Sequence, residues 1–380
     1  MRGLIVYISG VSWDAVPGTD QMMAAALASY ADVLWVEPVG SVLRSAGSGR
    51  RLHEGRPALG VQRVTVLGLP GVTRPGARTV AVAQMSRAIE RAVDHRRVAA
   101  VIVASPLARF PALPGAKRMY FATDDWLEGA RLMGLSPRHL ARREREAIAL
   151  AEVVAAVSPS LAGTLGNRSG REVFTLPNGC TLPPLQSPRA HADGAAFVGQ
   201  MNERTDLRLV EAVVDAGVGL VIAGPLTARN AGFRSEFGKL VSRPGVRWLG
   251  QVSRQEISPI LNSATVGITP YADTEFNRAS FPLKTLEYLA FGLACVSTPS
   301  PSLDWLNTGL VDQAHTPAQF AGLVQSRTRE AVSAGERARR RDFASHHSWD
   351  ARARQLLGLV DLGYAMIPHA FNTTGREGTL

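Results

Sequence analysis

Asn277-Arg-Ala-Ser-Phe-Pro-Leu-Lys-Thr-Leu-Glu-Tyr-Leu-Ala-Phe-Gly-Leu-Ala-Cys-Val-Ser-Thr298 has the pattern of a loop, a helix, a tight turn and a buried strand. Ser280 is a candidate N-cap, and Pro282 stands near the first helical position, where a missing N–H costs nothing. Gly292 marks the helix end, and the short apolar run after it suits a strand of a parallel sheet. The stretch therefore predicts a helix that leads directly into a buried strand.

Lys284 and Glu287 are the charged residues of this predicted helix. They are one turn apart, so both side chains leave the helix near the same side. The helix start also offers free backbone N–H groups and the positive end of the helix dipole, which suit a phosphate. Two interpretations follow from these residues alone: a nucleotide-binding site, or an amphipathic helix with a local Lys–Glu pair.

The composition of the chain indicates a folded protein with acidic partners. The 380 residues are enough for about two domains, and 46% of them are hydrophobic. The net charge of +10 suits nucleotide phosphates, anionic lipid or nucleic acid, although an Arg-rich proteome would explain it equally well. Cys180 and Cys295 are too few for a disulfide framework or a metal cluster.

The N-terminal segment is apolar but too short to span a membrane, because Gly10 and Asp14 follow it at once. It is better explained as a first buried strand. No later apolar run is long enough to cross a membrane either. The sequence therefore predicts a cytoplasmic protein, with peripheral contact to the inner face of a membrane left open.

Predicted strands and helices alternate along the whole chain. Strands are expected near residues 3–8, 33–36, 61–67, 98–104, 118–126, 153–157, 173–176, 195–199, 219–223, 246–249, 265–268 and 293–296. This alternation predicts an α/β fold with two doubly wound parallel sheets, and the Pro- and Ser-rich segment 183–193 is the expected linker between them. Ligands are expected in the cleft between the two domains, at the carboxyl ends of both sheets.

Short motifs recur in a particular order along the chain. They are Trp13-Asp14, Thr123-Asp-Asp-Trp126, Val157-Ser-Pro-Ser160, Leu176-Pro-Asn-Gly179, Phe197-Val-Gly199 with Arg204 and Asp206, Gly250, and Phe281-Pro-Leu-Lys-Thr-Leu-Glu-Tyr-Leu-Ala290 with Val296-Ser-Thr298. Together they resemble the motifs of retaining nucleotide-sugar glycosyltransferases of the GT-B fold, in glycosyltransferase family 4 and the group 1 set. The most similar branch holds transferases of teichuronic-acid type and of other cell-surface polysaccharides.

This resemblance implies two Rossmann-like domains that face each other across a cleft. Residues 1–185 would form the acceptor-side domain, completed by a helix over 348–365 that crosses back to it, while 192–345 would form the donor-side domain and 366–380 a tail. The implied reaction moves a sugar from a UDP- or GDP-sugar to a hydroxyl of a carbohydrate, a lipid-linked or a small-molecule acceptor. Retention of configuration and independence from metal ions and other cofactors are implied as well.

The resemblance also implies which residues hold the donor. Glu287 resembles the last glutamate of the family's Glu-x7-Glu signature, which accepts hydrogen bonds from the ribose hydroxyls. Ala279 stands where the first glutamate would contact the donor sugar, so the identity of that sugar is open. The backbone of Phe281, Pro282 and Leu283 would face the sugar or the phosphate.

The family's diphosphate clamp is an Arg and a Lys that follow the first strand of the second domain. Here Gln200, directly after Gly199, takes the Arg position, and Arg204 stands near the Lys position. A leaving nucleoside diphosphate gains negative charge as the glycosidic bond breaks, and Arg204, Lys284 and helix N-termini would stabilise that charge without a metal. The alternative for Arg204 is a surface ion pair with a neighbouring acid.

Asp124 and Asp125 suit the acceptor side of the cleft. Acids at a strand end can orient an acceptor hydroxyl or stabilise an oxocarbenium-like centre. Adjacent residues of an extended chain point to opposite sides, which argues against joint metal binding, and Asp125 is alternatively an N-cap. Trp13 and Asp14, in the first loop, are expected where acceptor or donor sugar passes, with core packing as the alternative for Trp13.

Other functional classes fit parts of the sequence. A nucleotide-sugar epimerase or a dinucleotide oxidoreductase could use a similar architecture, but no Gly-x-Gly-x-x-Gly follows either first strand. A non-catalytic protein that binds sugar nucleotides or nucleic acid fits the missing acid at Ala279 and the charge. Against nucleic acid, the sequence has no aromatic-plus-basic surface motif.

Overall fold

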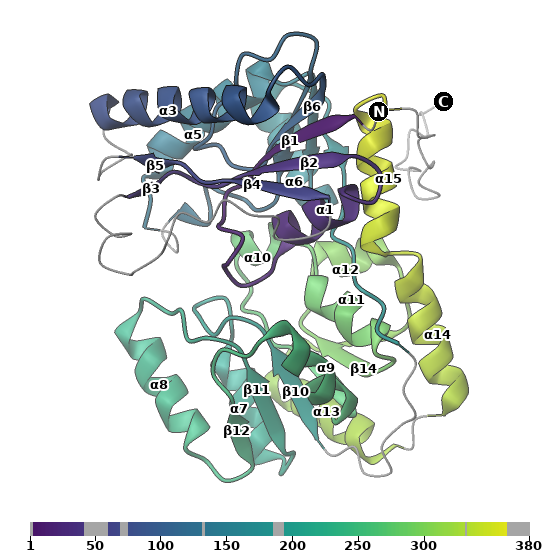
Figure 1. Ribbon diagram of the computed structural model, residues 1–380. Helices are drawn as coiled ribbons and strands as arrows, with labels where there is room; N and C mark the ends of the chain where they lie inside the picture. The colour runs from purple at the N-terminus through teal and green to yellow at the C-terminus, as the bar shows by residue number, and fades with distance from the viewer. Residues whose placement is uncertain are drawn as a thin grey trace, which may run out of the picture.

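The computed structural model describes residues 3–41, 60–68, 75–130, 134–184, 194–330 and 333–362. Two large sheets of parallel strands occupy separate halves of the molecule (Figure 1). This confirms the predicted α/β fold of two Rossmann-like domains. The expected linker at 183–193 and the expected tail at 366–380 fall largely or wholly outside the described residues.

The first sheet has seven strands, with β1 near its centre. In spatial order they are β4 (Val61–Val64), β2 (Asp32–Val36), β1 (Leu4–Ile8), β6 (Val98–Val103), β7 (Lys117–Ala122), β8 (Val153–Ala156) and β9 (Phe174–Thr175). The side chains of β1 are buried along its whole length, as expected for a parallel strand with helices on both faces. The strand order reverses between β1 and β6, so the loop after β1 opens at the switch point where ligands bind.

The second sheet has six strands and repeats this plan around β10. In spatial order they are β12 (Val246–Trp248), β11 (Leu220–Ala223), β10 (Ala195–Val198), β13 (Val266–Thr269), β14 (Ala294–Ser297) and β15 (Val311–Gln313). Its switch point lies between β10 and β13, which places the loop after β10 at the ligand-binding edge. A small third sheet pairs β3 (Gly40–Ser41) with β5 (Leu67–Gly68).

Helices connect the strands in both halves. In the first half they are α1 (Thr19–Leu27), α3 (Pro75–Val93), α5 (Pro137–Leu150) and α6 (Pro159–Ser169). In the second they are α7 (Leu207–Asp215), α8 (Ala231–Val241), α9 (Arg254–Asn262), α10 (Glu275–Ala279), α11 (Leu283–Ala290), α12 (Pro301–Leu306), α13 (Pro317–Arg329) and α14 (Ala334–Ser345). Of these, α8, α10 and α12 were not expected from the sequence, and neither was β15.

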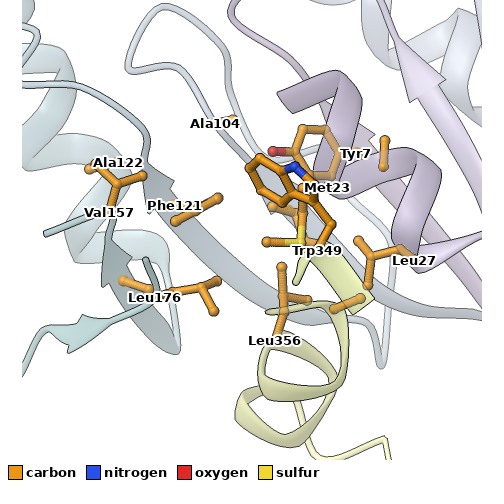
Figure 2. Packing of buried hydrophobic residues seen from close by; sticks show 14 of the residues in the cluster. Tyr7, Met23, Leu27, Ala104, Phe121, Ala122, Val157, Leu176, Trp349 and Leu356 are labelled. Carbon is orange, nitrogen blue, oxygen red and sulfur yellow. The ribbon is translucent and has the colours of Figure 1, made fainter. Parts of the chain in front are cut away.

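The C-terminal helix α15 (Trp349–Leu359) crosses back to the first half, as the resemblance implied. Figure 1 shows α14 beside the second sheet and α15 beside the first, along one edge of the molecule. Trp349 and Leu356 are buried in the core of the first half, where they pack near Tyr7 and Met23 (Figure 2). The chain therefore returns to the first half between α14 and α15.

The segment around Cys180, near the end of the first half, is hydrogen-bonded to the link between α14 and α15. Cys180 donates its N–H to the carbonyl of His347 (2.8 Å), and Trp349 donates its N–H to the carbonyl of Cys180 (3.2 Å). At Gly179 an added Cβ would lie 2.6 Å from the backbone nitrogen of Trp349, so only glycine allows this approach. Cys180 and Cys295 are both buried and free.

The expectation that Ser280 caps the helix of residues 277–298 is wrong. That helix, α11, begins at Leu283 with Pro282 as its N-cap. Ser280 instead ends the short helix α10, whose own N-cap is Thr274, and its hydroxyl donates back to the carbonyl of Phe276 (2.9 Å). The segment expected to be a loop is therefore partly helical. The predicted stop at Gly292 and the strand that follows are confirmed.

Candidate functional site

A cavity of about 720 Å³ lies between the two halves of the molecule. Its walls are the loops at the carboxyl ends of strands from both sheets and the start of α11, where the sequence placed the ligand cleft. The predicted residues on its wall are Asp124, Gly199, Arg204, Phe281, Pro282, Leu283, Lys284 and Glu287. The structure therefore gathers residues that are up to 163 positions apart in the sequence, from Asp124 to Glu287.

Asp124 faces the cavity from the loop after β7. No hydrogen bond to its carboxylate occurs among the described residues. Burial raises the pKa of Asp124 to about 6; the Arg204 charge across the cavity lowers it, and the charges of Asp20 and Asp125 raise it further. Asp124 therefore has a carboxylate without a hydrogen-bond partner among the described residues, and it is largely ionised at neutral pH. The charge of Arg204, on the second half, favours this ionised form.

Asp20 is a second buried acid of this wall, and the sequence reasoning did not find it. Its carboxylate accepts hydrogen bonds from the Tyr7 hydroxyl (3.0 Å), the Ser9 hydroxyl (2.7 Å) and the Gly10 N–H (3.1 Å). Burial raises its pKa, and these three hydrogen bonds oppose that effect. Asp20 therefore ties the loop after β1 to the start of α1. Its only sequence signal is an acid in the first turn of a helix after a glycine-containing loop.

Arg204 projects into the cavity from the loop after β10, where several contacts hold it. Its Nε donates to Asn277 Oδ1 (2.8 Å), and its Nη2 donates to Ser280 Oγ (3.2 Å). The guanidinium lies 4.8 Å from the ring centroid of Phe276 and 5.5 Å from that of Tyr271. Within the described residues it forms no ion pair, so the alternative of a surface pair with Asp206 or Glu203 does not hold.

Lys284 and Glu287 both line the cavity and also contact each other. Lys284 Nζ lies 2.7 Å from Glu287 Oε2, and each side chain is about a quarter exposed. The local Lys–Glu pair, one of the two interpretations of this helix, is therefore present. It lies on the wall of a large cavity, which the other interpretation, a nucleotide site, also requires. A bound ligand would have to share or replace this pair.

The helix α11 is fixed to the sheet below it by Tyr288. The Tyr288 hydroxyl accepts from the Val198 N–H (2.9 Å) and donates to the Ile268 carbonyl (3.3 Å). Its ring lies on β13 at Gly267, where an added Cβ would be 2.2 Å from Tyr288 Cγ. Because Tyr288 neighbours Glu287, this packing sets which face of α11 is turned to the cavity.

Gly199 lines the cavity at the end of β10, where the next loop approaches it closely. At Gly224, with φ of +146°, a Cβ would lie 1.6 Å from the Gly199 carbonyl oxygen. Gly224 in turn donates its N–H to the Gly250 carbonyl (2.7 Å). The glycines that follow β10 and β11 therefore bring backbone groups to the cavity wall without side chains in the way.

Asp125, Trp13 and Asp14 are predicted site residues that are not part of the described cavity wall. The Asp125 carboxylate accepts from the N–H groups of Leu127 (3.1 Å) and Glu128 (3.2 Å), so it stabilises a turn. Both acids lie beyond the end of β7, and the Asp125 carboxylate is held by this turn and by Arg168, which lies 3.7 Å from it. The N-cap alternative is the better description of Asp125.

The first-loop residues are turned away from the cavity by local packing. The Trp13 indole packs edge-on against Trp35, with ring centroids 4.9 Å apart. Asp14 pairs with Arg63 at 2.8 Å. The cavity is lined instead by Val11, two positions before Trp13, and by Ala15, directly after Asp14. The first loop thus lines the cavity through residues other than Trp13 and Asp14.

Ala279, at the place of the missing glutamate, is buried and does not line the cavity. Its carbonyl accepts a hydrogen bond of 2.5 Å from Ser158 Oγ, at the start of α6 in the first half. Ser158 is itself fully buried and also caps α6. This position therefore contributes to the contact between the two halves and not to the cavity wall.

Two further findings concern metals and membranes. Among the residues that the structure describes, no group of three or more His, Cys, Asp or Glu side chains could hold a metal ion. None of the described helices is long and apolar enough to cross a membrane.

Comparison with known proteins agrees with this geometry. Residues 193–326, which run from β10 into α13 and include the second-half wall of the cavity, match the family described as glycosyl transferases group 1. This match covers about a third of the chain, and together with the similar proteins below it supports a glycosyltransferase of the GT-B fold. Its similarity to solved structures, below, extends this fold to the first half.

Similar proteins include one from Bacillus subtilis strain 168. TuaH, whose name describes a glycosyltransferase of teichuronic acid biosynthesis, is 25% identical over 205 residues, which are 50% of this chain and 51% of TuaH. The match thus spans about half the length of TuaH. Among solved structures, sucrose-phosphate synthase from Thermosynechococcus elongatus has a TM-score of 0.69 at 16% identity and covers 95% of this chain and 99% of its own. Anabaena HepE in complex with UDP and glucose has a TM-score of 0.64 at 14% identity, with coverages of 94% and 99%.

Proposed function

We propose that this GT-B protein transfers a sugar from a UDP- or GDP-sugar to a hydroxyl group of a carbohydrate, a lipid-linked or a small-molecule acceptor. The observation that carries the proposal is the asymmetry of the cavity. Arg204 and Lys284 lie on its second-domain wall, while Asp124 lies on its first-domain wall. A diphosphate suits the cationic wall, and an acceptor hydroxyl suits the carboxylate.

The donor would lie along α11. Glu287 would accept hydrogen bonds from the ribose hydroxyls, and the backbone of Phe281, Pro282 and Leu283 would face the phosphates near the N-terminus of the helix. Lys284, released from Glu287, would pair with the diphosphate together with Arg204. These cations would stabilise the charge of the leaving nucleoside diphosphate, and we propose that no metal ion or other cofactor is required.

Asp124 would accept a hydrogen bond from the attacking hydroxyl or stabilise positive charge at the anomeric carbon. An ionised carboxylate is needed for either role, and its pKa of about 6 leaves it ionised at pH 7. Configuration would be retained, as in the family that the motifs resemble. Within this proposal Asp125, Trp13 and Asp14 act only by shaping the loops.

The names of similar proteins support a nucleotide-sugar donor. HepE was crystallised with UDP and glucose and with UDP-glucose, and TuaH is named for the biosynthesis of a cell-surface polymer. We extend this to propose a cytoplasmic enzyme of polysaccharide biosynthesis. Exposed Arg138, Arg142 and Arg145 on one side of α5 would allow contact with an anionic membrane surface.

A donor screen tests the proposal. The protein is incubated with UDP- and GDP-sugars, and the release of UDP or GDP is followed by chromatography with and without added acceptors. Acceptor-dependent release from at least one donor is the expected result. Conversion of a donor to its epimer would instead favour the epimerase, and binding of every donor without release or conversion would favour a non-catalytic binder.

A further inference from the structure

Apolar side chains are exposed at the mouth of the cavity. Among the described residues, the large hydrophobic side chains with high exposure are Val11 (40%), Val16 (38%), Leu182 (38%), Val80, Leu150, Trp248 and Leu249. The first three of these seven line the cavity. Exposed apolar groups that gather at the rim of a concave site, instead of lying scattered, commonly contact a ligand.

The two valines lie on the first-domain wall, the side that carries Asp124. Val11 follows Gly10, and Gly10 packs closely against the Trp126 ring. A Cβ added to Gly10 would lie 2.9 Å from that ring. Trp126 is two residues after Asp124. The loop that carries the valines and the loop that carries the acid are therefore packed together. An acceptor with its hydroxyl at Asp124 has the apolar rim within reach.

The backbone of the first loop is held in place beside the rim. The Val11 N–H donates to Ser9 Oγ (3.0 Å), and the Ser9 hydroxyl lies within hydrogen-bond distance of both the Val11 carbonyl and Asp20. Gln21 accepts from the Gly18 N–H (3.1 Å) and donates to the Ser12 carbonyl (3.0 Å), which closes the loop on itself. The valines are thus presented by a hydrogen-bonded loop, as a preformed surface requires.

The polar side chains of this wall are largely committed to each other. Thr19 donates to Asn178 Oδ1 (2.8 Å), Gln21 is bonded at both ends of its amide, and Asp20 accepts three hydrogen bonds. A sugar with many hydroxyls would need hydrogen-bond partners on this wall, but these side chains are already hydrogen-bonded within the protein. One uncommitted acid beside an apolar surface suits a different ligand, one that has a hydroxyl close to an apolar group.

We propose that the acceptor carries an apolar group, alkyl or aryl, that packs on Val11 and Val16 while its hydroxyl meets Asp124. This rests on the proposed function, because it names the acceptor class for the same site. Two sources share this chemistry: a sugar on a soluble apolar aglycone, and a sugar on a polyprenyl carrier.

Binding of glucosides by calorimetry tests this directly. The probes are methyl, n-hexyl and phenyl β-glucoside and farnesyl phosphate, each titrated into the protein without nucleotide. The hexyl and phenyl glucosides are expected to bind at least about tenfold more tightly than the methyl glucoside, since each buried methylene is worth about fourfold in affinity. Tighter binding of farnesyl phosphate than of hexyl glucoside would indicate the lipid carrier, and weaker binding the soluble aglycone.

Serine variants locate the contact. The double variant Val11→Ser/Val16→Ser is expected to reduce the preference for hexyl over methyl glucoside to below about threefold. Val80→Ser, an equally exposed valine on α3 away from the cavity, is the matched control and should keep the preference. Equal binding of hexyl and methyl glucosides, or an unchanged preference in the double variant, would overturn the proposal. A titration with UDP and GDP on the same samples reports separately on the proposed function.

Discussion

Arg204 is the central residue of the proposed donor site, and Asn277 holds it in position. The Asn277 side chain accepts from Arg204 Nε (2.8 Å) and donates to the Arg204 carbonyl (3.0 Å) and to the Ala272 carbonyl (2.8 Å). A single amide thus holds both the backbone and the guanidinium of Arg204. Because Asn277 is more than nine-tenths buried, its role is to orient the cation.

Replacement of Asn277 should therefore weaken nucleotide binding. In Asn277→Ala the Arg204 guanidinium loses its fixed orientation, and the affinity for UDP or GDP is expected to fall about tenfold, because a hydrogen bond to a charged group is worth about 1.5–3 kcal/mol. Calorimetric titration measures this. Asn230→Ala, which removes the exposed cap of α8, is the control and should bind normally. Equal affinities in the two variants would show that Asn277 does not position Arg204.

Asp124 predicts a pH dependence. Its pKa is raised to about 6, chiefly by burial, so the carboxylate gains a proton as the pH falls through 6. If the ionised form meets the acceptor hydroxyl, kcat/KM should fall below pH 6 and level off above pH 7. Asp124→Asn should be slower by at least about 100-fold and lack this limb. An identical acid limb in wild type and variant would assign it to another group.

Asp20 shows why single residues are the hardest part of a site to predict. Nothing in the composition of the first loop indicates that Tyr7, Ser9 and Gly10 would all donate to one carboxylate. That arrangement depends on how the end of β1 turns into α1. In contrast, Glu287, Lys284 and Arg204 could be placed on the cavity because they belong to a family motif whose order along the chain is visible.

At the scale of elements, α14 holds the C-terminal end of α11. Three arginines of α14 donate to carbonyls there: Arg341 to Ala290 (2.7 Å), Arg337 to Phe291 (3.4 Å) and Arg340 to Gly292 (3.3 Å). Cations near unpaired C-terminal carbonyls stabilise a helix. The helix that presents Lys284 and Glu287 is thus stabilised at one end by a neighbouring helix.

The shortest of these contacts gives a test. Arg341 also donates to the Pro183 carbonyl (2.8 Å), so Arg341→Ala removes two hydrogen bonds from a charged group. The free energy of unfolding should fall by about 1.5–3 kcal/mol in urea titrations. Arg339→Ala, on the exposed side of the same helix, should change it by less than about 0.5 kcal/mol. Equal losses in both would mean that the capping contacts contribute little.

The elements themselves could largely be predicted, and most of the exceptions are short: α10, α12 and β15 have three to six residues, whereas α8 has eleven. Strands such as β1 and β10 are apolar runs bounded by turn residues, which sequence patterns identify well. Helix α10 has only five residues, and contacts between Asn277 and the loop after β10 help to hold it. The local sequence pattern cannot reveal such a short helix. For this reason Ser280, which ends α10, was predicted to begin α11.

At the scale of the molecule, α15 makes the first half depend on the end of the chain. Trp349 is 5% exposed and lies with Tyr7, Met23 and Leu356 in the first core (Figure 2). Truncation of a buried aromatic side chain costs about 3–5 kcal/mol. Trp349→Ala should lower the free energy of unfolding by this amount, whereas Leu150→Ala, at an exposed site, should change it by about 0.5 kcal/mol or less. A loss below about 1 kcal/mol would contradict the role given to α15.

The plan of the whole molecule was predictable because alternating strands and helices allow few arrangements. What the sequence could not supply is how the halves meet, since Ser158 and Ala279 lie 121 residues apart and nothing local links them. The consequence for function is that the position of the missing glutamate is occupied by a contact between the halves.

The most direct test of a nucleotide-sugar site between the two halves is calorimetric titration with UDP, GDP and NAD. One of the diphosphates should bind to the wild type, and Glu287→Ala and Arg204→Ala should each weaken it by at least about tenfold. Binding of NAD but of neither diphosphate, or full affinity in both variants, would contradict that assignment.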